Sequence, residues 1–63
     1  MNRELKAEIV RSYGSQFKFA HAIGEHEANV SRVIRGRISL DEETKRRWAE
    51  TLGVDVNRVF PEG

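Results

Sequence analysis

Apolar residues recur every three or four positions in several short stretches of this chain, and a glycine or a proline follows each stretch. This spacing places the apolar side chains on one face of an α-helix. In the first stretch Leu5, Ile9 and Tyr13 are four residues apart, and Val10 is expected at the edge of the buried face. The pattern predicts an amphipathic helix over residues 2–13 that stops at Gly14.

A second helix is predicted over residues 16–23. Ser15 is a good N-cap, because its hydroxyl can accept a hydrogen bond from a free backbone N–H of the first turn. The apolar stripe consists of Phe19, Ala20 and Ile23. Gly24 is expected to close the helix, since glycine adopts the left-handed conformation that ends helices at low steric cost.

A third helix is predicted over residues 27–35, with His26 at the cap position and Gly36 as its stop. At about 100° per residue, Val30 and Val33 point to the same side, which we expect to be buried. On the opposite, exposed face lie Ala28, Ser31, Arg32 and Arg35, flanked by Glu27 and Asn29.

The sequence SLDE at residues 39–42 has the spacing of a capping box, in which Ser39 caps a helix and Glu42 reaches back to it. We therefore expect a fourth helix from about Leu40 that ends at Gly53. Its apolar stripe, at intervals of four, consists of Leu40, Thr44, Trp48 and Leu52. Trp48 is expected in the core rather than as a platform for a ligand.

A last helical turn is predicted after Asp55, which would cap it, and before Pro61. Its apolar residues are Val56, Val59 and Phe60. Without internal repeats or a long linker, the pattern predicts one all-α domain over residues 1–63, a compact bundle of about five short helices. A chain of this size buries only about 60% of its unfolded surface, so close packing, helix caps or a partner subunit must stabilise it.

The composition narrows the class of protein. There is no cysteine, which excludes disulfides and thiolate metal sites. No apolar run approaches the roughly 20 residues of a membrane span, and Met1 to Glu4 does not begin a signal peptide. We expect a soluble, cytoplasmic protein with no membrane partner.

No catalytic arrangement is evident. The chain has no glycine-rich phosphate loop and no combination of nucleophile, base and orienting group. His21 and His26 are five residues apart, which does not fit a helical metal pair, and no third ligand is evident. We expect no enzyme activity, no cofactor, no metal and no small-molecule substrate.

Charge is nearly balanced, with eleven Lys and Arg against ten Asp and Glu and a net charge of +1. Its distribution is uneven: three arginines and no acid lie between Ala28 and Leu40, and three acids follow at residues 41–43. On charge alone, a basic binding surface and an ordinary solvated helix face are equally favoured.

The exposed face of the third helix suits the major groove of DNA, which admits one helix and presents a base-specific pattern of donors and acceptors. Arg32 would form two hydrogen bonds with guanine, and Asn29 would bind adenine or a phosphate oxygen. Glu27 would accept from a cytosine amino group. Arg35 and Arg37 are better placed for phosphates.

The segment SQFKFAHAIGEHEANVSRVIRGR resembles the helix-turn-helix of the Cro/repressor (XRE-like) DNA-binding family. The resemblance runs from Tyr13 to Phe60, with the helix-turn-helix at about residues 15–36. The matching positions are Gln16, Phe19-Ala20, Ile23-Gly24, Val30-Ser31 and Arg35-Gly36. Two positions depart from the family pattern: Glu25 replaces an apolar residue, and His26 replaces a serine or threonine cap.

The resemblance implies a lambda-repressor-like bundle whose second and third helices read DNA. Ala20 would be small so that these helices cross closely, and Gly24 would make the turn between them. The residues expected at base edges are Glu27, Ala28, Asn29 and Arg32. The residues expected at phosphates are Gln16, His26, Ser31, Arg35 and Arg37.

The sequence therefore predicts a sequence-specific transcriptional regulator of bacterial or phage type, a repressor, that binds double-stranded DNA. One helix reads few base pairs, so we expect a homodimer on two half-sites about 34 Å apart, joined through Val56, Val59 and Phe60. The alternative is a helix-turn-helix domain used for protein–protein interaction or assembly. This alternative is favoured by Glu25 and Glu27, and by the apolar residues Ile34 and Phe60 if they are exposed. The pattern leaves the burial of Phe17 and Ile34 open.

Overall fold

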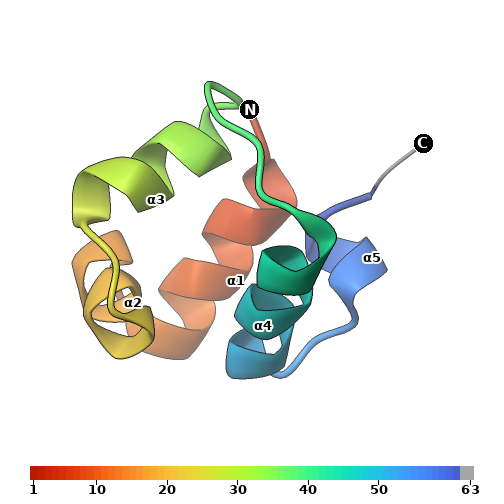
Figure 1. The fold of residues 1–63 in the computed structure, drawn as a ribbon. Coiled ribbons are helices and arrows are strands. Elements are labelled where there is room, and N and C mark those ends of the chain that lie inside the picture. Colours follow the sequence, from red (N-terminus) through yellow and green to blue (C-terminus); the bar gives the residue numbers. More distant parts are fainter. Residues whose placement is uncertain (62–63) are drawn as a thin grey trace.

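The computed structural model describes residues 1–61, in which five α-helices and no strand occur (Figure 1). None of these helices is long and apolar enough to cross a bilayer. The helices are α1 (Arg3–Tyr13), α2 (Gln16–Ile23), α3 (Glu27–Ile34), α4 (Glu42–Leu52) and α5 (Val56–Val59). The predicted all-α architecture of five short helices is thereby confirmed.

Helix α1 holds the bundle together, because it packs on each of the other four helices. The pair α2 and α3 lies on one side of it, and α4 and α5 lie on the other (Figure 1). The side chain of Asn2 caps α1 by accepting from Leu5 N at 3.0 Å and donates to Val59 O, while its backbone N–H donates to Ile34 O. The start of α1 is thus tied to the ends of α3 and α5.

A row of aromatic rings crosses the core. Tyr13 and Phe19 have ring centroids 5.4 Å apart, Phe19 and Trp48 5.3 Å, and Trp48 and Phe60 6.3 Å. The first two pairs meet edge to face, the arrangement that aromatic quadrupoles favour. The row joins α1, α2, α4 and the end of α5, and it confirms Trp48 as a core residue.

The prediction that Val10 lies at the buried edge of the first helix is wrong, since Val10 is 46% exposed. The buried residues of α1 are Leu5, Glu8 and Ile9. With Leu5 at zero, Glu8 lies at about 300° and Ile9 at about 40°, whereas Val10 lies at about 140°. The inner face therefore extends on the Glu8 side of Leu5 and Ile9, and not on the Val10 side where the apolar pattern placed it.

Four further apolar residues that the sequence offered for contacts with another chain lie in the core or against it. Ile34 is 2% and Phe60 7% exposed, so neither is available to a protein partner. Val59 is fully buried and Val56 packs against the core, so this segment is not an exposed dimer contact. These residues close the bundle of the single chain, because α5 folds back on α1 and α4.

The predicted cap of the fourth helix is also wrong. Asp41, not Ser39, caps α4, and its Oδ1 accepts from Thr44 N at 2.8 Å. The hydroxyl and the backbone N–H of Thr44 hold the pKa of Asp41 below its ordinary value. Leu40 is partly buried and packs against the core before the helix begins. Helix α4 therefore starts at Glu42, two residues after the predicted start at Leu40.

Candidate nucleic-acid interface

The turn between α2 and α3 is built from local contacts. Ser15 Oγ accepts from Lys18 N at 3.2 Å and so caps α2, as predicted. Gly24 ends α2 with φ +74°, a backbone conformation that is strained for a residue with a side chain. A Cβ atom at this position would meet no other atom within 4 Å, so the requirement for glycine comes from the backbone alone. The N–H of Glu25 then donates to Ala20 O at 2.8 Å, and His26 is extended before α3 begins. The chain therefore reverses within three residues.

Helix α3 has a buried and an exposed side. Val30, Val33 and Ile34 are buried, and α3 packs with them against α1 and α2. Because these three side chains fix the rotation of the helix, the opposite face points to solvent. This confirms the orientation of the third helix that the sequence predicts.

None of the predicted site residues is buried. The exposed ones are His26, Glu27, Ala28, Arg32, Arg35 and Arg37. The half-buried ones are Gln16, Asn29 and Ser31. Gln16 is the first residue of α2, His26 precedes α3, and Arg37 lies in the loop that follows α3.

His26 occupies the N-cap position of α3, but its side chain makes no capping hydrogen bond. The backbone carbonyl of His26 accepts from Asn29 N at 3.0 Å, as the first turn requires. The imidazole therefore lies at the exposed start of α3, and it is not used to close the helix end.

A chain of side-chain hydrogen bonds runs along the outer side of the turn and α3. Arg32 Nη1 donates to Asn29 Oδ1 at 3.0 Å, and Asn29 Nδ2 donates to Glu25 Oε1 at 3.2 Å. The contacts that join Glu25 to Asn29 and Asn29 to Arg32 are not among the predictions from the sequence. The spacing of four and then three residues between Glu25, Asn29 and Arg32 is the signal that could have indicated them.

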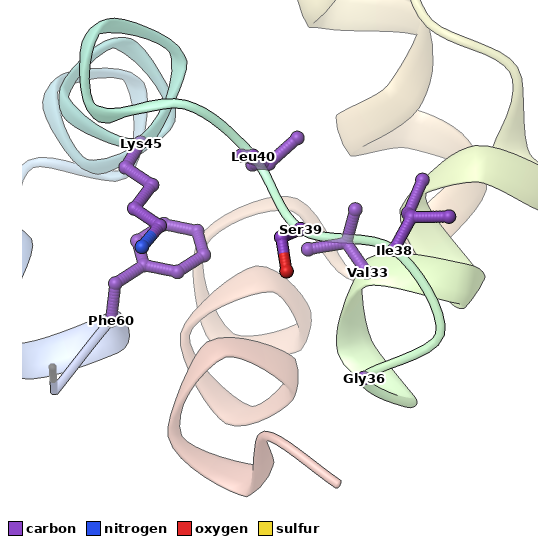
Figure 2. A pocket seen from close by; sticks show the side chains of 7 residues that line it. All are labelled: Val33, Gly36, Ile38, Ser39, Leu40, Lys45 and Phe60. Atoms are coloured by element: carbon purple, nitrogen blue, oxygen red, sulfur yellow. The ribbon is translucent and has the colours of Figure 1, made fainter.

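A small open pocket of about 160 Å³ lies beside the loop that follows α3 (Figure 2). The residues that line it are Val33, Gly36, Ile38, Ser39, Leu40, Lys45 and Phe60. Lys45 Nζ lies 5.8 Å from the centroid of the Phe60 ring and 3.7 Å from Glu42 Oε2. This volume is below the roughly 300 Å³ at which ligand pockets begin. Within residues 1–61, no group of three metal-ligating side chains occurs either.

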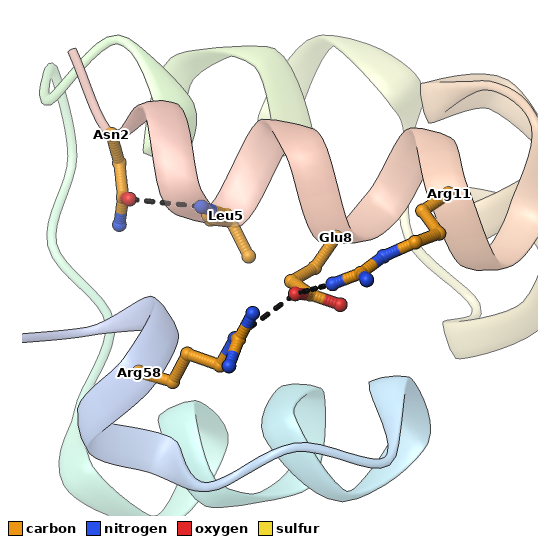
Figure 3. Close-up of polar contacts among 5 residues, drawn as sticks. All are labelled: Asn2, Leu5, Glu8, Arg11 and Arg58. Carbon is orange, nitrogen blue, oxygen red and sulfur yellow. Dashed lines mark hydrogen bonds and ion pairs between the residues drawn. The ribbon is translucent and has the colours of Figure 1, made fainter.

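The arginines differ in their partners. Arg11 and Arg58 both pair with the buried Glu8 on the far side of α1 (Figure 3). Arg32, Arg35 and Arg37, by contrast, form no ion pair with any carboxylate of residues 1–61. The guanidinium groups on and after α3 are therefore not neutralised within the part of the chain that the structure describes.

No protein-family model, curated protein or solved structure matches this chain. The resemblance to the Cro/repressor family therefore stays a prediction from the motif residues.

Proposed function

We propose that the protein is a sequence-specific transcriptional regulator, a repressor, that inserts α3 into the major groove of double-stranded DNA. The observation that carries the proposal is the outward face of α3, on which Arg32 and Arg35 stand beside the small Ala28. An α-helix with its side chains is about 10–12 Å in diameter, and the major groove is about 12 Å wide. An exposed helix of this size fits the groove.

The base-reading roles follow from the donors and acceptors on that face. Arg32 offers the paired N–H groups that match O6 and N7 of guanine, and Glu27 offers an acceptor for the amino group of cytosine. Ala28 permits close approach and can contact a thymine methyl group. Asn29 reaches adenine or a phosphate.

Phosphate contacts would set the position of α3 in the groove. Arg35 and Arg37 supply charge. Gln16 and His26 supply further donors at the starts of α2 and α3, and Ser31 supplies one within α3. Because the net charge is only +1, non-specific attraction to DNA is weak. Selectivity must then come chiefly from the base contacts.

The test is selection of bound sites from a random DNA pool, followed by a salt titration on the selected site. If Arg35 and Arg37 contact phosphates, the logarithm of the DNA-binding constant should fall linearly with the logarithm of the salt concentration, with a slope of about −2 per chain. Arg46→Ala is the matched control for Arg35→Ala and should leave the salt slope unchanged. It removes one exposed charge from α4, which packs mainly on α1 and α5. Failure to enrich any sequence, or an affinity independent of salt, would contradict the proposal.

A protein-interaction module is the second candidate function. Ile34 and Phe60 no longer support it, because both are buried. The observation that favours it is Phe17, which is 64% exposed on α2 next to Gln16. If this function is the real one, Phe17→Ser should abolish a salt-insensitive association with a protein, whereas Arg35→Ala should not.

A further inference from the structure

We propose that Glu25, which does not itself reach a base, is a positioning residue that sets the selectivity of Arg32 through Asn29. The inference rests on the proposed DNA-reading function. It starts from the two hydrogen bonds that join Glu25 to Asn29 and Asn29 to Arg32.

The chemistry of the three groups allows only one arrangement of the Asn29 amide. A carboxylate only accepts hydrogen bonds, and a guanidinium only donates them. Asn29 therefore turns its NH2 group to Glu25 and its carbonyl oxygen to Arg32. The flipped amide would lose both bonds and place donor against donor at Arg32. Glu25 thus holds the amide in the one orientation that presents its oxygen to Arg32.

Glu25 is itself held by the turn. Its backbone N–H donates to Ala20 O at 2.8 Å, directly after Gly24. Asn29 is half-buried on α3, which restricts its side chain further. The hydrogen bonds therefore connect a fixed point at the end of α2 with the flexible guanidinium of Arg32.

The contact leaves Arg32 able to read a base. One N–H of Nη1 is used at Asn29, and four of the five N–H donors of the guanidinium remain. A guanidinium ordered before binding loses less side-chain entropy on reaching guanine. The carboxylate of Glu25 also repels phosphates, which lowers affinity for every sequence alike. Glu25 accordingly raises selectivity while it lowers overall affinity.

The direct test of the hydrogen bonds needs no DNA. In a two-dimensional NMR spectrum, the side-chain NH2 signals of Asn29 should move on Glu25→Ala and stay near the wild-type position on Glu25→Gln, which keeps an acceptor. Glu43→Gln, an equal charge change at an exposed residue of α4, should not move them. Unmoved Asn29 signals in Glu25→Ala would overturn the inference and leave the proposed function standing.

The functional test compares affinity for the selected site with affinity for the same site after the base pair read by Arg32 is replaced. Glu25→Ala should lower this ratio about three- to tenfold while raising affinity for the replaced site. Glu25→Gln should restore part of the ratio, and Glu43→Gln should leave it unchanged. In the Asn29→Ala background, Glu25→Ala should lower the ratio no further, because the connection is already broken.

A purely structural or electrostatic role of Glu25 would change stability or overall affinity but not this ratio. An equal ratio in wild type and Glu25→Ala would therefore overturn the inference. Absence of any selected site for the wild type would instead overturn the proposed function, and the inference with it.

Discussion

Arg32 and Arg35 lie three residues apart on the same exposed face of α3, but their surroundings differ. Arg32 is bound to Asn29, whereas Arg35 is the C-cap residue of α3 and makes no ion pair with residues 1–61. An arginine that is held by a neighbouring side chain suits a directed contact to a base. One at a helix end suits the diffuse charge of the phosphate backbone.

We expect Arg32→Ala to cost about 1–3 kcal/mol of binding free energy on the selected site and to relax the preference at one base pair. Arg35→Ala should weaken binding to all sequences alike and reduce the salt slope by about 1. Fluorescence anisotropy on the selected site and on single-base variants measures both effects. Equal losses on every sequence for both variants would contradict the assigned roles.

Asp41 shows how one residue determines where a helix begins. Its carboxylate accepts from Thr44 N and has a lowered pKa, because the Thr44 hydroxyl and backbone N–H favour the ionised form. Since its pKa is lower in the folded than in the unfolded state, ionised Asp41 stabilises the fold at neutral pH. This contribution is lost as the pH falls below about 4.

Asp41→Ala is therefore expected to lower the Tm at pH 7, and the difference from wild type should shrink as the pH falls toward 3. Ser39→Ala is the control, and it should melt at the wild-type temperature, because Ser39 does not cap α4. Thermal melts followed by circular dichroism at several pH values measure this. A lower Tm for Ser39→Ala alone would restore the capping box that the sequence predicted.

At the scale of the elements, the polar cluster at Glu8 fastens α5 to α1. Glu8 is only 4% exposed, and its Oε2 accepts from Arg58 Nε at 3.0 Å and from Arg11 (Figure 3). Because α5 has four residues, it cannot be stable by itself and depends on such contacts. The cluster thus adds to the burial of Val59 and Phe60.

Glu8→Ala should destabilise the protein by about 1–3 kcal/mol, since it removes a buried hydrogen-bonded charge. Arg58→Ala should cost about 1 kcal/mol or less, because the Arg58 side chain is 59% exposed and solvent screens its charge. Urea denaturation gives both free energies of unfolding. Glu4→Gln, on the exposed side of α1, should change the free energy of unfolding little. An equal loss of stability for Glu4→Gln and Glu8→Ala would contradict the role assigned to Glu8.

At the scale of the whole molecule, one chain offers a single short helix, α3, for the proposed base contacts. The Cα atoms extend over 28 × 23 × 20 Å, so two copies on half-sites about 34 Å apart would be near neighbours on DNA. Because Val59 and Phe60 belong to the core of each copy, any contact between copies must use other side chains.

We expect two chains on each selected site, arranged on half-sites related by two-fold symmetry. Analytical ultracentrifugation of the protein with and without the selected DNA measures the stoichiometry. A monomer both free and on DNA would contradict the proposed homodimer, and a selected site without two-fold symmetry would point to the same conclusion.

The helices could be predicted from the sequence because helix formation is local. The hydrogen bonds of a helix span four residues, and its caps act within one turn. Ser15, Gly24, Gly53 and Asp55 therefore set the ends of α2, α4 and α5 as expected. The outward face of α3 followed in the same way from the spacing of its valines.

Tertiary structure decided what depends on distant partners. Ile34 is buried and Val10 is exposed because of the helices that pack, or do not pack, on their sides of α3 and α1. Helical periodicity does not predict burial for residues at the edge of an apolar stripe. The charge of the buried Glu8 is compensated by Arg58, 50 residues later in the chain, and only the fold brings the two together. Helical periodicity and capping are read from neighbouring residues, whereas burial and ion pairing require segments that only the folded chain brings together.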